Sequence, residues 1–99
     1  MAANMSNIRL RTATDREVLE EIGERLRALR EARSLTQKEA AQRAGIARRT
    51  LYAAEHGDNP TLQTLIRLLR AYSRLDALEN FIPRPEVSPM ARLRERKGS

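Results

Sequence analysis

Residues 36–57 read TQKEAAQRAGIARRTLYAAEHG, and this stretch decides the fold of the chain. Thr36 and Glu39 have the spacing of a capping box, in which the side chain of each residue accepts a hydrogen bond from the backbone N–H of the other. Gly45 follows an alanine-rich segment, and glycine takes the left-handed conformation that ends a helix without steric cost. The first half of the stretch therefore predicts a short helix that begins at Thr36 and ends at Gly45.

The second half predicts another helix, from about Ala47 to His56, which Gly57 ends. Ile46 and Leu51 are apolar and lie where they can fill the space between two helices that cross at a steep angle. The first helix carries small side chains, which allow a neighbouring helix to cross closely over it. These are Ala40, Ala41 and Ala44. Two helices joined by a short glycine-containing turn form a helix-turn-helix, whose second helix enters the major groove of DNA. The stretch therefore indicates a DNA-binding unit.

A family resemblance is carried by the runs Leu35-Thr36-Gln37, Ala44-Gly45-Ile46, Glu55-His56-Gly57 and Asn59-Pro60. Through these runs, residues 22–69 resemble the Cro/repressor-type helix-turn-helix family, also called the xenobiotic-response-element family. The resemblance implies an all-α fold, namely a five-helix, lambda-repressor-like DNA-binding domain with the helix-turn-helix at its second and third helices. It also implies the direction in which the domain docks on DNA.

The pattern outside this stretch predicts three further helices in a domain of residues 14–82. Thr14 and Glu17 have the spacing of a second capping box, which starts the first helix at Thr14 or at the next residue. Thr61 can cap a fourth helix, and Ser73 can cap a short fifth helix, where related domains form their dimer contact. The first, fourth and fifth helices carry apolar side chains at helical spacing: Leu19, Ile22, Leu26 and Leu29; Leu62, Leu65, Ile66, Leu68, Leu69 and Tyr72; Leu75, Leu78, Phe81 and Ile82.

The two ends of the chain lie outside this domain. Residues 1–13 alternate apolar and polar side chains over part of their length, so they are either a disordered tail or a strand that pairs with its symmetry mate in a dimer. Residues 83–99 form a basic tail that prolines interrupt. This tail is either a disordered extension or a second contact with a polyanion or a protein partner.

The composition indicates one small helical domain with a polyanionic partner. The chain has 99 residues, of which 32% are charged and 3% are aromatic, so the core is built mainly from leucine, isoleucine and alanine. The formal net charge is +6, and residues 36–50 hold four basic side chains against one acidic side chain. This clustering favours nucleic acid as the partner.

The residue types present argue against several other kinds of protein. No cysteine is present, so neither disulfides nor thiolate metal sites are possible. His56 is the single histidine, and it lacks the neighbours that a metal site or a catalytic base needs. No nucleophile–base pair or phosphate loop is found, so we expect no enzyme, no cofactor and no metal. We find no apolar run that could span a membrane and no hydrophobic signal core, so we expect a cytoplasmic protein.

The exposed face of the predicted reading helix carries two neighbouring guanidinium groups, those of Arg48 and Arg49. Arginine pairs two N–H donors with the O6 and N7 atoms of guanine, which is worth about 1–3 kcal/mol of discrimination. We therefore assign base reading to Arg48 and Arg49, together with Tyr52 and Thr50. Ala47 stands where relatives usually carry a hydroxyl cap. Ala53 stands where relatives often carry a base-reading polar residue.

Contacts with the phosphate backbone are expected at the start of the second helix and beyond the third. Gln37 stands where backbone N–H groups and the helix dipole favour a phosphate oxygen. The resemblance implies this phosphate role for Gln37, and also for His56 and Asn59. Arg43 and Lys38 are weaker candidates for the same role.

The resemblance also implies a structural ion pair between Arg30 in the first helix and Glu55 near the end of the reading helix. Such a pair would hold the reading helix on the scaffold. The alternative is an arginine on the surface without this partner.

Together, these features predict a transcriptional repressor that binds double-stranded DNA at a palindromic operator as a homodimer. An alternative comes from residues 75–97, which resemble antitoxins of the persistence-kinase (HipB-like) type. In that case the protein would bind a kinase-like toxin and would repress its own operon.

Overall fold

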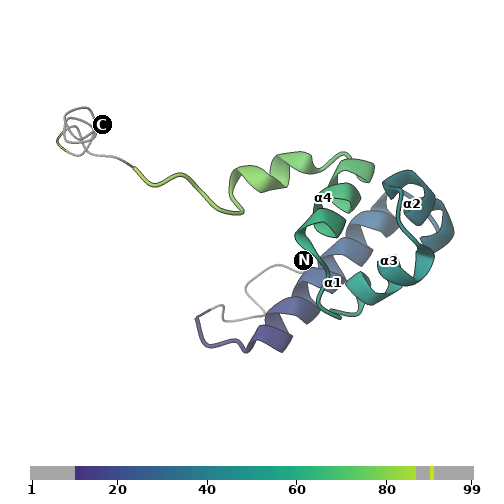
Figure 1. Ribbon diagram of the computed structural model, residues 1–99, viewed down its shortest axis with the longest axis horizontal. Helices are drawn as coiled ribbons and strands as arrows, with labels where there is room; N and C mark the ends of the chain where they lie inside the picture. Colours follow the sequence, from purple (N-terminus) through teal and green to yellow (C-terminus); the bar gives the residue numbers. More distant parts are fainter. Residues whose placement is uncertain (1–10, 87–89, 91–99) are drawn as a thin grey trace.

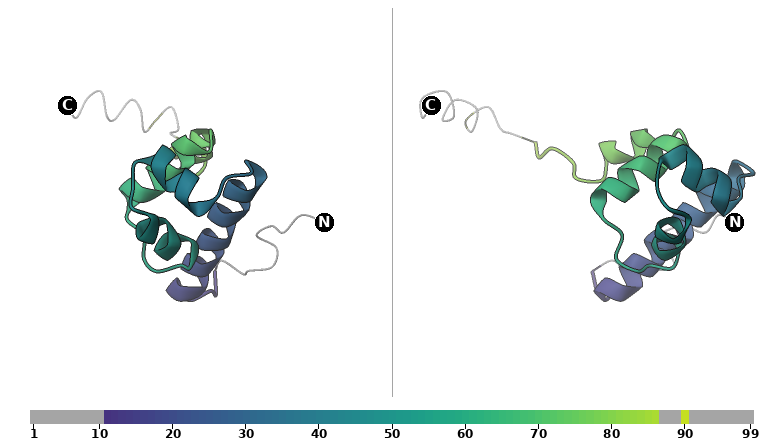
Figure 2. Two further views of the ribbon diagram at one scale, coloured as in Figure 1. Left: turned by 90° about the vertical axis from the view of Figure 1, so that its right-hand side faces the viewer. Right: turned by 45° about the vertical axis from the view of Figure 1, so that its right-hand side comes forward.

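The computed structural model describes residues 11–86 and residue 90, and this part of the chain is helical and contains no strand. Figure 1 shows the elements in chain order: α1 (Asp15–Ala32), α2 (Gln37–Ala44), α3 (Arg48–Glu55), α4 (Leu62–Ala71) and the 3-10 helix η2 (Leu75–Glu79). α3 packs against α1, α2 and α4, so it is the element that the other helices share (Figure 2). The predicted all-helical fold is confirmed for the described residues.

The helices α1, α2 and α4 begin where the hydroxyl caps predict. In the capping boxes of α1 and α2, the backbone N–H of Thr14 donates to Glu17 Oε1 (2.8 Å), and that of Thr36 donates to Glu39 Oε1 (2.9 Å). The hydroxyl oxygen of Thr61 caps α4. Hydrogen bonds from the backbone and then the side chain of Thr36 lower the pKa of the Glu39 carboxyl below its usual value. These three helix starts are therefore local properties of the sequence.

The helices α1 to α4 end in a common motif, in which one residue takes the left-handed conformation. These residues are, in chain order, Ser34 (φ 56°), Gly45 (φ 70°), Gly57 (φ 71°) and Ser73 (φ 57°). After α4, the N–H of Arg74 donates to the Leu69 carbonyl (2.7 Å) and the N–H of Ser73 donates to the Arg70 carbonyl (3.1 Å). This is the Schellman pattern, which satisfies the last carbonyls of a helix.

The five-helix count is not confirmed, because the 3-10 helix η2 lies where a fifth α-helix was expected. Ser73 does not cap it, since Ser73 is the left-handed residue that closes α4. An N-cap residue needs an extended backbone, so Ser73 cannot close α4 and also cap the start of η2. Phe81 and Ile82, which were expected on the fifth helix, lie beyond the end of η2 and are exposed.

Both predictions for the chain ends fall largely outside the described residues, which exclude residues 1–10, 87–89 and 91–99. Within residues 1–13, Arg11 and Thr12 lie in a turn before α1. The strand pairing and the roles given to the basic tail stay predictions.

The core lies between the four α-helices, and α1 crosses α3 at a very short distance. Leu51, Leu68 and Tyr72 are its largest fully buried side chains. A Cβ atom placed on Gly23 of α1 would lie only 2.5 Å from the backbone oxygen of Glu55 in α3. The two helices approach this closely because glycine has no side chain. The sequence reasoning assigned no role to Gly23.

Gly23→Ala is expected to destabilise the protein by about 3 kcal/mol, because the added methyl group meets backbone oxygens that cannot rotate aside. At an exposed helical position the same change stabilises by about 1 kcal/mol, so the sign of the effect is diagnostic. Urea unfolding measures it, with Glu24→Ala at the neighbouring exposed position as the control. A variant as stable as the wild type would contradict the close crossing.

Tyr72 is fully buried, and its hydroxyl group has no hydrogen-bond partner among the described residues. Burial raises the pKa of Tyr72 from 10.0 to about 12; the charge of Glu55 adds to the rise and that of Arg30 opposes it. Above pH 10 the unfolded chain loses the phenol proton that the folded chain still holds. Stability that is fully present below pH 10 is therefore lost as the pH rises towards about 12.

Tyr72→Phe is expected to remove this alkaline loss of stability, which is about 1–1.5 kcal/mol at pH 11 for a shift of that size. The measurement compares urea midpoints at pH 8 and pH 11 for the wild type, for Tyr72→Phe and for Tyr52→Phe. Tyr52 is exposed, so its variant is the matched control. The same alkaline decline in Tyr72→Phe as in the wild type would show that another group causes it.

Candidate nucleic-acid interface

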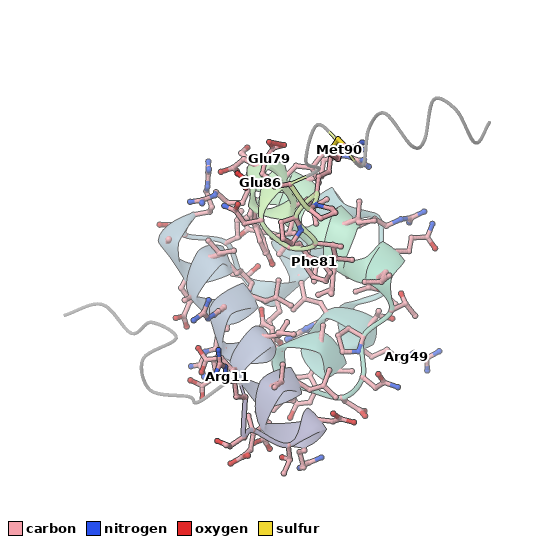
Figure 3. All side chains as sticks on the ribbon, turned by 90° about the vertical axis from the view of Figure 1, so that its left-hand side faces the viewer. Arg11, Arg49, Glu79, Phe81, Glu86 and Met90 are labelled. Atoms are coloured by element: carbon pink, nitrogen blue, oxygen red, sulfur yellow. The ribbon has the colours of Figure 1, made fainter. Side chains whose placement is uncertain are left out.

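α3 has one buried face and one exposed face. Its buried side chains are Leu51, Ala54 and Glu55. Arg48, Arg49 and Tyr52 are exposed on the other side, and Arg49 points away from the rest of the chain (Figure 3). Thr50 is half-buried and lies two positions from Tyr52, which is about 200° around the helix. Three of the four residues predicted to read bases therefore share a face, and Thr50 is turned away from Tyr52.

The N-terminus of α3 has no side-chain cap. Ala47 occupies the capping position without a side-chain hydrogen bond, and no acidic residue stands in the first turn. Arg48 and Arg49 follow at once, so their charge adds to the positive end of the helix dipole. This arrangement disfavours the helix in isolation and attracts an anionic partner to this end.

Arg30 and Glu55 form a buried ion pair between α1 and α3. Arg30 Nε donates to Glu55 Oε2 (2.6 Å), and Arg30 Nη2 donates to Glu55 Oε1 (3.1 Å). The two residues are only 9% and 6% exposed. Arg30 Nη1 also donates to the Leu35 carbonyl (2.9 Å), which ties the link between α1 and α2 to the same group. The hydrogen bond to Glu55 raises the pKa of Arg30 despite the cost of burial.

Gln37 joins this network from the first turn of α2. Its Nε2 atom donates to Glu55 Oε1 (3.3 Å), and the residue is half-buried. The amide group keeps a second N–H and an oxygen, so it can still donate to an anion while Glu55 holds it. The residue predicted to bind a phosphate is therefore positioned by α3.

Lys38 and Arg43 are both exposed on α2. They are five positions apart, which places them about 140° apart around the helix. They lie on opposite sides of the helix face that carries the buried alanines, so the structure does not bring them onto one face. A flat anionic surface that contacts one of these two weaker phosphate candidates therefore does not contact the other.

His56 and Asn59 follow α3 and are exposed. The imidazole ring of His56 stacks on the phenol ring of Tyr52, with ring centroids 3.9 Å apart and planes inclined by 22°. His56 Nδ1 lies 2.8 Å from the Tyr52 carbonyl oxygen. Asn59 has a left-handed backbone (φ 41°) in the loop before α4, which asparagine adopts more readily than most residues.

A family model described as helix-turn-helix matches residues 26–78, which is more than half of the chain. The chain belongs to the Cro/repressor-type helix-turn-helix family. This helix-turn-helix protein is accordingly a DNA-binding transcription regulator. The sequence matches no curated protein.

The match covers the part of this helix-turn-helix protein that carries the candidate interface. It begins within α1, contains α2, α3 and α4 in full, and reaches into η2. Among the described residues, no group of three or more His, Cys, Asp or Glu side chains is arranged to hold a metal ion. None of the described helices combines the length and the apolar character that crossing a bilayer requires.

Two contacts that position the helix-turn-helix were missed in the sequence reasoning. Arg67 on α4 donates from Nη1 to the Gly45 carbonyl oxygen (2.9 Å), so α4 holds the turn between α2 and α3. Gly23 lets α1 approach the end of α3. The close approach at Gly23 could have been predicted, because a glycine on the apolar face of a helix indicates that another helix crosses there. No signal in the sequence relates Arg67 to a residue 22 positions earlier.

The Arg30–Glu55 pair is expected to couple strongly in a double-mutant cycle. Glu55→Ala alone leaves a buried guanidinium without its partner and costs about 3–5 kcal/mol, and Arg30→Ala strands the carboxylate at a similar cost. The double variant should cost much less than the sum of the two. Urea unfolding of the four proteins measures the coupling, and additive losses would mean that the pair does not hold α3 on α1.

Proposed function

We propose that this protein is a transcriptional repressor that binds a palindromic operator as a homodimer and reads bases with α3. The observation that carries the proposal is the pair Arg48 and Arg49, exposed on the front of a helix whose back is fixed by the buried Glu55. A rigid helix presents its guanidinium groups in one geometry, which is what bidentate recognition of guanine needs. DNA is also the partner that agrees with the cytoplasmic location expected from the sequence.

Affinity is expected to come mainly from phosphates. Each phosphate that the protein neutralises releases counterions, so the logarithm of the binding constant falls with the logarithm of salt by about 0.9 per contact. Gln37 contributes a neutral hydrogen bond at the start of α2, and Asn59 contributes a polar side chain from the loop after α3. Neither contact carries sequence information, so both should act alike on every duplex.

Specificity is expected to come from the front of α3. Arg48 and Arg49 pair with guanine in the major groove, and Tyr52 is a third contact on the same face. Ala53 leaves no long side chain beside them, so DNA shape contributes to the remaining discrimination. In a dimer the two copies of α3 would lie one helical turn of DNA apart, about 34 Å.

Arg48→Ala and Arg49→Ala are each expected to lower operator affinity by about 1–3 kcal/mol and to change affinity for random DNA much less. Gln37→Ala should weaken both kinds of duplex by the same factor. The operator is selected from a random pool with the wild type, and affinities are measured by fluorescence anisotropy at two salt concentrations.

Arg48→Lys and Arg49→Lys are the matched controls, because they keep the charge and lose the two-donor geometry. They should keep the salt dependence of the wild type and lose operator preference. Equal losses on operator and random DNA for the alanine variants would contradict base reading by these residues. Failure of the wild type to prefer any duplex would overturn the proposed function.

The homodimer is supported by an apolar groove between α1, α4 and η2. The groove has a volume of about 980 Å³, and Arg25 is the one charged residue on it among the described residues. The charge of Arg25 is paired with Glu21 (2.8 Å), so the groove favours an apolar occupant. Phe81 and Ile82 line the same groove and are 49% and 76% exposed. One surface therefore offers both a depression and projecting apolar side chains, as a self-complementary two-fold contact requires.

Ile82→Asp is expected to shift the protein towards monomer, because it places a charge in an apolar contact. Light scattering at several protein concentrations measures the mass, and Glu79→Asp on η2 serves as an exposed control. A dimer whose dissociation constant is unchanged in Ile82→Asp would exclude this surface as the contact.

The HipB-like alternative gives the same groove a different occupant, a kinase-like toxin. It rests on residues 75–97, whose resemblance to antitoxins includes the exposed Phe81 and Ile82. Co-purification with the product of a neighbouring kinase-like gene, combined with a monomeric chain in its absence, would favour the antitoxin.

A further inference from the structure

We propose that His56 is a positioning residue, which holds the ring of Tyr52 in one orientation so that the two stacked rings act as a single specificity element. This inference rests on the proposed role of α3 as the reading helix and extends it to a residue that the sequence assigned to phosphate binding. It is carried by the geometry of the Tyr52–His56 pair.

Two contacts join His56 to Tyr52. The ring centroids are 3.9 Å apart and the planes are nearly parallel, which is an offset or stacked arrangement rather than an edge contact. The Nδ1 atom of His56 also lies 2.8 Å from the backbone oxygen of Tyr52. Side chains on a helix lean towards its N-terminus, so a residue four positions later naturally covers its predecessor. His56 therefore lies over Tyr52 on the exposed face of α3.

The surroundings make His56 the residue that orders Tyr52. Tyr52 is 53% exposed, so the core does not fix its ring. Ala53, the next residue, is half-buried and has no atoms beyond Cβ with which to pack on a ring. Arg48 lies one turn earlier in the same row of the helix and is exposed. One face of the Tyr52 ring is therefore covered by imidazole, and its edge and hydroxyl group remain available.

The hydrogen bond of His56 also bears on its assigned role at the phosphate backbone. A carbonyl oxygen can only accept, so Nδ1 of His56 must carry the proton in the bond to Tyr52. In the neutral ring the remaining nitrogen, Nε2, is then an acceptor. A phosphate oxygen is an acceptor as well, so neutral His56 has no proton to give it. With Nδ1 engaged by the Tyr52 carbonyl, His56 is placed to order its neighbour.

The expected gain is one of preorganisation. An unordered tyrosine loses rotamer freedom when it meets a base, and a tyrosine already held in place avoids that loss. Loss of the stack should therefore lower operator affinity about three- to tenfold. Affinity for random DNA should change less than twofold, because random duplexes offer no base that needs the ring in one place.

Three variants separate the two roles of His56. His56→Phe keeps a ring on Tyr52 and has no polar atom for a phosphate. His56→Asn has a polar amide for a phosphate and no ring, and His56→Ala has neither. Each is compared with the wild type on the duplex selected from a random pool and on a random duplex, with and without Tyr52→Ala.

If the proposal holds, His56→Phe retains the ratio of operator to random affinity, while His56→Asn and His56→Ala lower it about three- to tenfold. In the Tyr52→Ala background, His56→Asn should then lower the ratio no further. A preserved ratio in His56→Asn, a lost ratio in His56→Phe, or a further loss in the Tyr52→Ala background would each overturn the proposal.

A measurement on the free protein keeps this test separate from the proposed function. Nuclear magnetic resonance of the wild type should show upfield ring-current shifts for the Tyr52 ring protons, retained in His56→Phe and lost in His56→Asn. Absence of these shifts in the wild type would overturn the positioning role. If these shifts are present but the protein prefers no duplex, the proposed function is rejected. The role of the Tyr52–His56 pair in specificity is then rejected with it.

Discussion

The ion pair between Arg30 and Glu55 is the interaction on which the rest of the structure depends. α3 has eight residues, no side-chain cap and a basic first turn, and a helix of that length is not stable alone in water. Its order and direction must therefore come from its neighbours. The buried carboxylate of Glu55 receives hydrogen bonds from α1 through Arg30 and from α2 through Gln37. One charged group thus orients α3 and Gln37 together.

The same helix separates stability from recognition by its two faces. The back of α3 is fully used, since its apolar side chains fill the core and Gly23 lets α1 come within contact distance of its backbone. The front makes few contacts with the rest of the domain and carries the guanidinium groups. Side chains on the front therefore contribute little to folding, whereas those at the back contribute to it directly.

Much of the fold could be predicted because it is encoded locally. The hydroxyl caps at Thr14, Thr36 and Thr61 and the glycine at the turn each act within four residues, and the structure contains all of them. A short helix was expected where η2 lies, but its 3-10 form was not predicted, because apolar spacing does not distinguish a fifth α-helix from a 3-10 turn once Ser73 has closed α4. Gly23 and Arg67 act on residues far away in sequence, so only the packed structure relates them to α3. The stacking of Tyr52 and His56 has a spacing of four residues and could have been predicted, but the single histidine was considered only as a ligand or a phosphate contact.

Because Ala47 provides no cap for α3, DNA binding through α3 depends on the folding of the whole domain. Because α3 has no start signal of its own, it exists only while its neighbours hold it, and no partly unfolded form of the chain is expected to retain the reading surface. Heat or denaturant should then abolish DNA binding and tertiary structure in a single step. A cell that warms past the melting point of this small domain would lose regulation abruptly rather than by gradual weakening.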